Sequence, residues 1–173
     1  MDDKQAMRGA LALAQCAAAA GDVPVGAVVL DASGVVIGRG YNTREVHGDP
    51  LAHAEILAMR QAAEHRASAL GAACSATADS VARAGGSHAA AAWNLADCTL
   101  VVTLEPCPMC AGACLQTHIG RIVFGAWDSK LGACGSVWDI PRDPHIGHSP
   151  EIYGGVLERE SAMLLAEFFA PRR

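Results

Sequence analysis

The chain has 173 residues, of which 51% are hydrophobic, 5% aromatic and 18% charged, and it carries a formal net charge of −5. A chain of this size is expected to form one compact domain that buries about 70% of its unfolded surface. The acidic balance argues against a generally basic nucleic-acid-binding surface, although it leaves room for a local basic patch.

Targeting and membrane functions lack support in the sequence. No charged segment followed by an apolar stretch opens the chain, and no run of about 18 apolar residues could cross a bilayer. Seven cysteines, an odd number without a secretory signal, suit reduced thiols or metal ligands better than a disulfide framework. We therefore expect a cytoplasmic protein that does not act at a membrane.

The first half of the chain predicts a helix, a hairpin and a second helix. Residues 4–20 repeat apolar side chains at helical spacing, and Gly21 ends the pattern. Two β-rich runs, Val25 to Leu30 and Val35 to Tyr41, are joined by the turn sequence Asp-Ala-Ser-Gly. After a loop over 42–50, an Asp-Pro pair introduces a helix predicted to run from about Leu51 to Arg66.

Residues 67–91 interrupt this pattern, because small and polar residues dominate and sizeable apolar side chains are scarce. We expect a flexible insertion that is partly helical at most. The second half resumes with a strand over 98–104, a helix over 108–118 and a strand over 121–125, which suggests a parallel crossover. A closing helix is predicted from Leu157 to Phe169. Helices and strands thus alternate, as in layered α/β domains.

The second half also carries a Cys-x-x-Cys motif where the predicted strand gives way to the helix. Cys107 and Cys110 would project from the same helical turn, so both sulfurs can reach one ion, and the N–H groups of a helix start favour thiolates. Two alternatives remain open for an isolated motif of this kind, namely buried structural thiols and a redox pair such as thioredoxin-like proteins carry. Cys114 and Cys134 are expected to pack in the interior instead of binding metal.

A His-x-Glu motif at the start of the earlier helix supplies what the cysteines lack. His53, which precedes Cys107 by 54 residues, offers a nitrogen, and Glu55 offers a carboxylate. Residues two apart on a helix differ by about 200° in direction, so Glu55 is a poor second ligand and a suitable proton carrier. Three protein ligands that leave the fourth position to water are typical of catalytic zinc sites. Such an ion lowers the pKa of its water toward about 7 and generates hydroxide, which could attack the amidine-type carbon of a nucleobase.

These two motifs, HAE and PCPMC, match the HxE…PCxxC signature of zinc-dependent nucleobase deaminases. Further segments, with sequences PVGAV, GYN, DPLAHAE, CPMCAGA and DSKLGACGS, narrow the resemblance. Over residues 1–66 and 92–173 the chain resembles the bacterial tRNA-specific adenosine deaminases of the zinc-dependent cytidine/deoxycytidylate deaminase superfamily.

The resemblance implies a single deaminase domain over 1–173, with the insertion at about 67–91. Its fold would be a three-layer α/β/α cytidine-deaminase-like fold with a central mixed sheet of about five strands. It also implies a homodimer that binds one Zn²⁺ per subunit, with water or hydroxide as the fourth ligand. The implied reaction is that of a hydrolase, which converts adenosine to inosine at the wobble position of a tRNA anticodon stem-loop.

The same resemblance assigns substrate contacts. Asn42 would bond the nucleoside and the N–H of Ala54 would help to hold the base, although Asn42 could equally cap a loop. A late basic set could contact phosphates, and from it we select Lys130 and His148 as substrate-binding; solvated surface charge is the alternative. That set comprises Lys130, Arg142, His145, His148, Arg172 and Arg173. The chain departs from the family in the insertion, at Leu51, where Thr is frequent, and at Gly147, where Asn often stands beside His148.

Three other functions compete with this interpretation. The nearest is a deaminase of free guanine or of another nucleobase or nucleoside, which would use the same metal chemistry. A dithiol oxidoreductase would use the two cysteines and leave the His-x-Glu motif unexplained. A non-catalytic, zinc-stabilised binding module predicts that replacing Glu55 has no effect on function.

Overall fold

The computed structural model describes residues 1–76 and 92–170, and its centre is a five-stranded mixed sheet. The strands are β1 (Gly26–Leu30), β2 (Val36–Tyr41), β3 (Thr99–Leu104), β4 (Arg121–Ala126) and β5 (Glu151–Tyr153). They lie in the order β2-β1-β3-β4-β5; β1 is antiparallel to both neighbours, and β3, β4 and β5 are parallel. The prediction of a mixed sheet of about five strands is confirmed.

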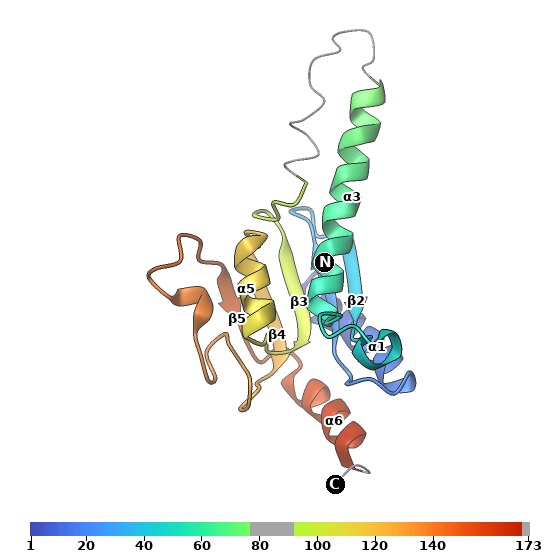
Figure 1. Ribbon diagram of the computed structural model, residues 1–173, viewed down its shortest axis with the longest axis vertical. Coiled ribbons are helices and arrows are strands. Elements are labelled where there is room, and N and C mark those ends of the chain that lie inside the picture. The colour runs from blue at the N-terminus through green and yellow to red at the C-terminus, as the bar shows by residue number, and fades with distance from the viewer. Residues whose placement is uncertain (77–91, 171–173) are drawn as a thin grey trace.

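Helices cover both faces of this sheet. Helices α3 (Ala54–Ala76) and α5 (Pro108–Gln116) pack on one face, against alternate strand residues such as Val29 and Leu100. Helix α1 (Asp3–Ala19) packs on the other face against the intervening residues such as Val28 and Val101, and Leu157, just before α6 (Glu158–Phe169), joins the same cluster. Because successive side chains of a strand point to opposite faces, the two separate clusters establish three layers. Figure 1 shows α3 extending well past the ends of the strands.

The first helix and the hairpin follow the sequence pattern closely. Asp2 accepts a hydrogen bond from the N–H of Gln5 at 2.7 Å in a capping box, and Gly21 takes a φ of 86° after the last turn. Gly34 has a φ of 79°, as the predicted turn between β1 and β2 requires. On β2, a Cβ at Gly38 or Gly40 would overlap carbonyl oxygens of α3. These two glycines therefore let α3 lie directly on the hairpin, which fixes the position of its first turn.

The predicted bounds of the second helix are wrong at both ends. Residues 51–53 form a turn in which the N–H of Leu51 donates to the carboxylate of Asp49 at 2.9 Å, so that α3 begins at Ala54. Helix α3 then continues past Arg66 to Ala76, through the first part of the predicted insertion, because that part is rich in alanine. The remainder of the insertion, 77–91, lies outside the described residues.

The structure adds elements that the pattern did not predict. A short helix, α2 (Arg44–His47), occupies the predicted loop over 42–50, and β5 forms the edge beyond β4. A turn of 3-10 helix, η1, spans Ile140–Arg142. The predicted crossover is confirmed, since α5 connects the parallel strands β3 and β4. Within the described ranges, no helix has both the length and the apolar character needed to cross a membrane.

Candidate metal centre and its cavity

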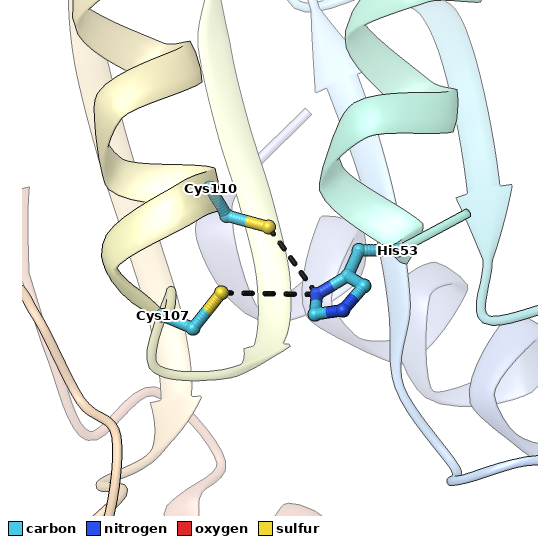
Figure 2. A group of neighbouring side chains, drawn as sticks. All are labelled: His53, Cys107 and Cys110. Carbon is cyan, nitrogen blue, oxygen red and sulfur yellow. Dashed lines mark hydrogen bonds between the residues drawn. The ribbon is translucent and has the colours of Figure 1, made fainter. Parts of the chain in front are cut away.

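The three predicted metal ligands converge on one point. The Nδ1 atom of His53 lies 3.8 Å from Sγ of Cys107 and 3.5 Å from Sγ of Cys110, as Figure 2 shows. All three ligand atoms lie within 4.8 Å of one another. A tetrahedral zinc ion with Zn–S of about 2.3 Å and Zn–N of about 2.0 to 2.1 Å separates its nitrogen and sulfur ligands by about 3.6 Å. The donor set and its spacing therefore fit zinc, and Nδ1 is the nitrogen that faces both sulfurs.

Two helix starts bring these side chains together. Cys107 is the N-cap residue of α5, Pro108 follows it with the φ that a first helical turn requires, and Cys110 lies within the same turn. His53 immediately precedes α3, and its carbonyl accepts the N–H of Leu57 at 3.1 Å. The positive ends of both helix dipoles thus point at the group, which favours anionic sulfur there.

The surroundings shift the pKa values of the two thiols in opposite directions. The pKa of Cys107 is lowered to about 4, first by its hydrogen bond with the Cys110 side chain and then by that with His53. The same contact with Cys107, followed by burial, raises the pKa of Cys110. The pKa of His53 is raised mainly by its hydrogen bond with Cys107. A metal bound here would displace the protons that Cys110 and His53 hold, so its affinity should rise with pH.

Glu55 lies beside the ligand group without belonging to it. Its side chain comes from the first turn of α3, is 3% exposed and lines the adjacent cavity. Burial raises the pKa of this carboxyl above its ordinary value. A carboxyl with a raised pKa holds a proton more readily than an ordinary one, which suits a group that must both accept and return a proton as a general acid–base.

A cavity of about 170 Å³ opens next to His53 and Glu55. This volume is below the roughly 300 Å³ at which pockets for drug-sized ligands begin, so the cavity suits a single ring system. Its wall combines apolar side chains with several polar and charged ones. The lining residues are Val23, Val25, Asn42, Arg44, His53, Glu55, Leu104, Glu105, Cys107, Asp128 and Leu131.

Asn42 connects the cavity to the start of α3. It is 5% exposed, and its Oδ1 accepts a hydrogen bond from the N–H of Ala54 at 2.9 Å across 12 residues of chain. Asn42 therefore caps the start of a helix, whereas the sequence alternative was the capping of a loop. It also engages the Ala54 N–H, which was expected to help hold the base, and Ala54 itself is fully buried outside the cavity lining. Asn42 also lines the cavity, and its amide nitrogen donates no hydrogen bond to another described residue.

The predicted basic set is not gathered at the cavity. Lys130 is exposed on the loop that carries Asp128, and its own N–H donates to the Asp128 carboxylate at 2.9 Å. His148 donates from Nε2 to the carbonyl of Ile119 at 2.7 Å and stacks on His118. Neither Lys130 nor His148 lines the cavity, so their contacts with RNA stay predictions. Arg142 pairs with Asp139 and His145 with Asp143, while Arg172 and Arg173 lie outside the described residues.

Sequence reasoning missed several residues of the cavity wall. Arg44 belongs to a segment that was expected to be an irregular loop, and Glu105 was passed over between the strand and the Cys-x-x-Cys motif. Asp128 opens a segment that supported the family resemblance, yet no role was predicted for it. In contrast, Cys114 and Cys134 are buried apart from the ligand group, as expected, and burial raises the pKa of Cys134 to about 12.

Comparisons with known proteins agree with this geometry. Residues 1–126 match the model of the cytidine and deoxycytidylate deaminase zinc-binding region. The chain is 41% identical to the tRNA-specific adenosine deaminase of Haemophilus influenzae, over 99% of this chain and 85% of that protein. It is 48% identical to the tRNA(Ile)-lysidine synthase of Deinococcus radiodurans over 97% of this chain, but it spans only 25% of that protein's length.

A solved structure from a study of A-to-I editing by tRNA:A34 deaminases at the wobble position of transfer RNA matches with a TM-score of 0.72 and 35% identity. That match covers 93% of this chain and 99% of the other. The chain therefore belongs to the cytidine and deoxycytidylate deaminase zinc-binding family and, within it, to the tRNA-specific adenosine deaminases.

Proposed function

We propose that this protein is a zinc-dependent hydrolase that converts adenosine to inosine at the wobble position of a tRNA anticodon. One observation supports the proposal most strongly. The Nδ1 atom of His53 lies 3.5 to 3.8 Å from the sulfurs of Cys107 and Cys110. This group lies beside the buried carboxyl of Glu55, at a cavity that suits one base. The relationship to the Haemophilus influenzae enzyme supports the choice of adenosine in tRNA.

His53, Cys107 and Cys110 would hold a zinc ion, which would supply a bound water with a pKa lowered toward about 7 as the nucleophile for C6 of adenine. Glu55 takes a proton from that water and passes it to a ring nitrogen, which makes C6 more electrophilic. The same carboxylate would then take the remaining proton from the oxygen that has added to C6 and deliver it to the departing amine, so that ammonia leaves and a carbonyl oxygen takes its place. Asn42 donates from its amide nitrogen to the substrate while its oxygen holds the start of α3.

A positive charge beside the cavity favours a polynucleotide over a free base as the substrate. Arg44 is exposed and lines the cavity, and among the described residues no carboxylate forms an ion pair with its guanidinium. A cation at this position can contact a phosphate next to the target nucleotide while the base enters the cavity. Lys130 and His148 would extend this contact along the anticodon stem-loop.

The proposal includes the states that the family resemblance implies. These are a single domain over residues 1–173, one zinc ion with water as its fourth ligand per subunit, a homodimer and a cytoplasmic location. Sedimentation equilibrium of the zinc-loaded protein tests the dimer, and metal analysis tests the zinc content. A monomer at micromolar concentration, or a metal content far below one per chain, would contradict these parts.

The decisive experiment incubates the zinc-loaded protein with a tRNA that carries adenosine at the wobble position and detects inosine by sequencing. Wild-type protein should convert the base, and Glu55→Ala should keep its zinc while losing about 10²- to 10⁴-fold in turnover. Glu64→Ala, at an exposed position of the same helix, is the matched control and should remain active.

Each competing function predicts a result of its own. Activity on free guanine or another free base, without activity on tRNA, would replace the tRNA proposal by the nearest alternative. Full function in Glu55→Ala would indicate a zinc-stabilised binding module. Loss of function on alkylation of Cys107 and Cys110, together with catalysed disulfide reduction by the wild-type protein, would indicate a dithiol oxidoreductase.

A further inference from the structure

A second carboxylate is buried beside the metal ligands and has no role in the proposed reaction. Glu105 lies between β3 and α5, two residues before Cys107, and is 2% exposed. In the described part of the chain, no lysine, arginine or histidine forms an ion pair with it. A buried carboxylate is costly unless hydrogen bonds compensate its lost hydration. The bonds that Glu105 accepts therefore indicate what it does.

All of these hydrogen bonds come from one loop. The N–H of Asp128 donates to Oε2 at 3.0 Å, and the N–H groups of Cys134 and Ser136 both donate to Oε1 at 3.0 Å. The hydroxyl of Ser136 donates to Oε2 as well. Four donors from residues 128–136 thus surround the carboxylate, much as backbone N–H groups surround a bound anion.

The backbone strengthens the same connection. The N–H of Glu105 donates to the carbonyl of Ala126 at 2.8 Å, and the N–H of Ala133 donates to the carbonyl of Pro106 at 2.9 Å. Gly132 lies so close that a Cβ there would overlap Oε2 of Glu105. Backbone hydrogen bonds therefore hold the connection from β3 to α5 against the end of β4 and against the loop over 128–136, in addition to the bonds that the Glu105 carboxylate accepts.

This loop forms part of the cavity wall. Asp128 and Leu131 line the cavity together with Glu105, Cys107 and Glu55. Although Leu131 is 54% exposed, the loop is fixed underneath by the Glu105 carboxylate. The position of the wall relative to Cys107 thus depends on a side chain that precedes this ligand by two residues.

We propose that Glu105 is a positioning residue, whose carboxylate holds residues 128–136 as the substrate-facing wall in register with the metal ligands. The inference rests on the proposed deamination for its kinetic consequence. A misplacement of about 1 Å in a catalytic site can cost about 100-fold in rate. Releasing the wall should therefore lower turnover even though the ligands and Glu55 are unchanged.

Glu105→Gln tests this inference because it keeps the shape of the side chain and replaces one acceptor oxygen by a donor. At least one loop N–H then loses its acceptor. Hydrogen exchange should accelerate at the amides of Asp128, Cys134 and Ser136 and stay unchanged at the sheet amides of Val101 and Val123. Zinc content should remain that of the wild type, and kcat on tRNA at saturating substrate should fall by about 10- to 100-fold.

Two further variants separate positioning from a general loss of stability. Val101→Ala, in the core under α1 on the opposite face of the sheet, should lower the unfolding temperature and leave kcat per bound zinc unchanged. Gly132→Ala should displace the loop from the carboxylate and lower kcat as Glu105→Gln does. If Glu105→Gln does not fold, the kcat of Gly132→Ala decides whether the position of the loop affects turnover.

The outcomes are distinct. Unchanged loop exchange or unchanged kcat in Glu105→Gln would overturn the inference, and so would an equal fall in kcat per zinc in Val101→Ala. If the wild-type protein fails to deaminate tRNA, the proposed function fails. The exchange measurement would still decide whether Glu105 holds the loop.

Discussion

Replacing Asn42 tests whether one side chain both caps α3 and binds the substrate. In Asn42→Ala the N–H of Ala54 loses its acceptor at 2.9 Å in a region where Asn42 is only 5% exposed. Loss of a side-chain cap costs about 0.5 to 2 kcal/mol, and a buried N–H without a partner costs about 1 to 3 kcal/mol. We therefore expect the free energy of unfolding to fall by about 1 to 2 kcal/mol. For a chain of this size, that lowers Tm by about 2 to 8 °C.

The variant Asn42→Asp separates the two roles. It keeps an acceptor for Ala54, and a carboxylate near a helix start stabilises by about 0.3 to 1 kcal/mol, so Tm should stay close to that of the wild type. It removes the amide donor, however, and places a negative charge near Glu55. Loss of one hydrogen bond to the substrate is worth about 1 kcal/mol, so kcat/KM should fall by about 5- to 10-fold.

The assays are thermal unfolding by circular dichroism at fixed free zinc and inosine formation in the adenosine-34 tRNA. Asn94→Ala is the matched control, because Asn94 also accepts a backbone N–H, from Ala96 at 3.0 Å, but does not line the cavity. It should leave kcat/KM unchanged. A wild-type Tm in Asn42→Ala would refute the capping role, and full activity in Asn42→Asp would refute the substrate contact.

Two further predictions concern charged side chains. Arg44→Gln should raise KM for tRNA and reduce the slope of log KM against log salt concentration by about 1. Arg60→Gln, at an exposed position of α3, is the control and should change neither quantity. Equal slopes in the two variants would exclude a phosphate contact. Asp3 accepts two hydrogen bonds from Arg121, at 2.7 and 2.8 Å, which lower the pKa of its carboxyl below 3.8. Its contribution is thus present above that pH and is lost as the pH falls through the lowered value. Asp3→Asn should lower the free energy of unfolding by about 0.5 to 1 kcal/mol at pH 7 and progressively less below pH 4, measured by urea titration. A difference of the same size at low pH would contradict this cause.

Elements with a clear periodicity could be predicted from the sequence, and those defined by side-chain contacts could not. The buried stripe of α1 and the turn at Gly34 follow from local pattern and backbone conformation alone. The start of α3 depends instead on Asp49, whose carboxylate holds the preceding turn. Its end was misjudged because alanine and serine are common both in loops and in helices. The strand β5 is only three residues long, too short for an alternating pattern to be recognised.

The candidate site divides in the same way. His53, Cys107 and Cys110 were predictable because ligand type, spacing and helix starts are local properties of the sequence. Glu105 and Asp128 meet because β3 and β4 are parallel neighbours, so their carboxyl ends share one edge of the sheet. That neighbourhood depends on strand order, which the motifs do not specify. Arg44 reaches the cavity through α2, where the sequence carried no recognisable signal.

The ligand group joins the starts of two helices that are distant along the chain: His53 precedes Cys107 by 54 positions and Cys110 by 57. An ion bound there acts as a cross-link between the beginnings of α3 and α5, and such a link exists only after both helices have reached their final positions. At a free concentration 100 times its Kd, a ligand of the folded state adds about 2.7 kcal/mol of stability. The resistance of this protein to heat should therefore follow the supply of zinc in its surroundings, and metal starvation would reduce its abundance together with its activity.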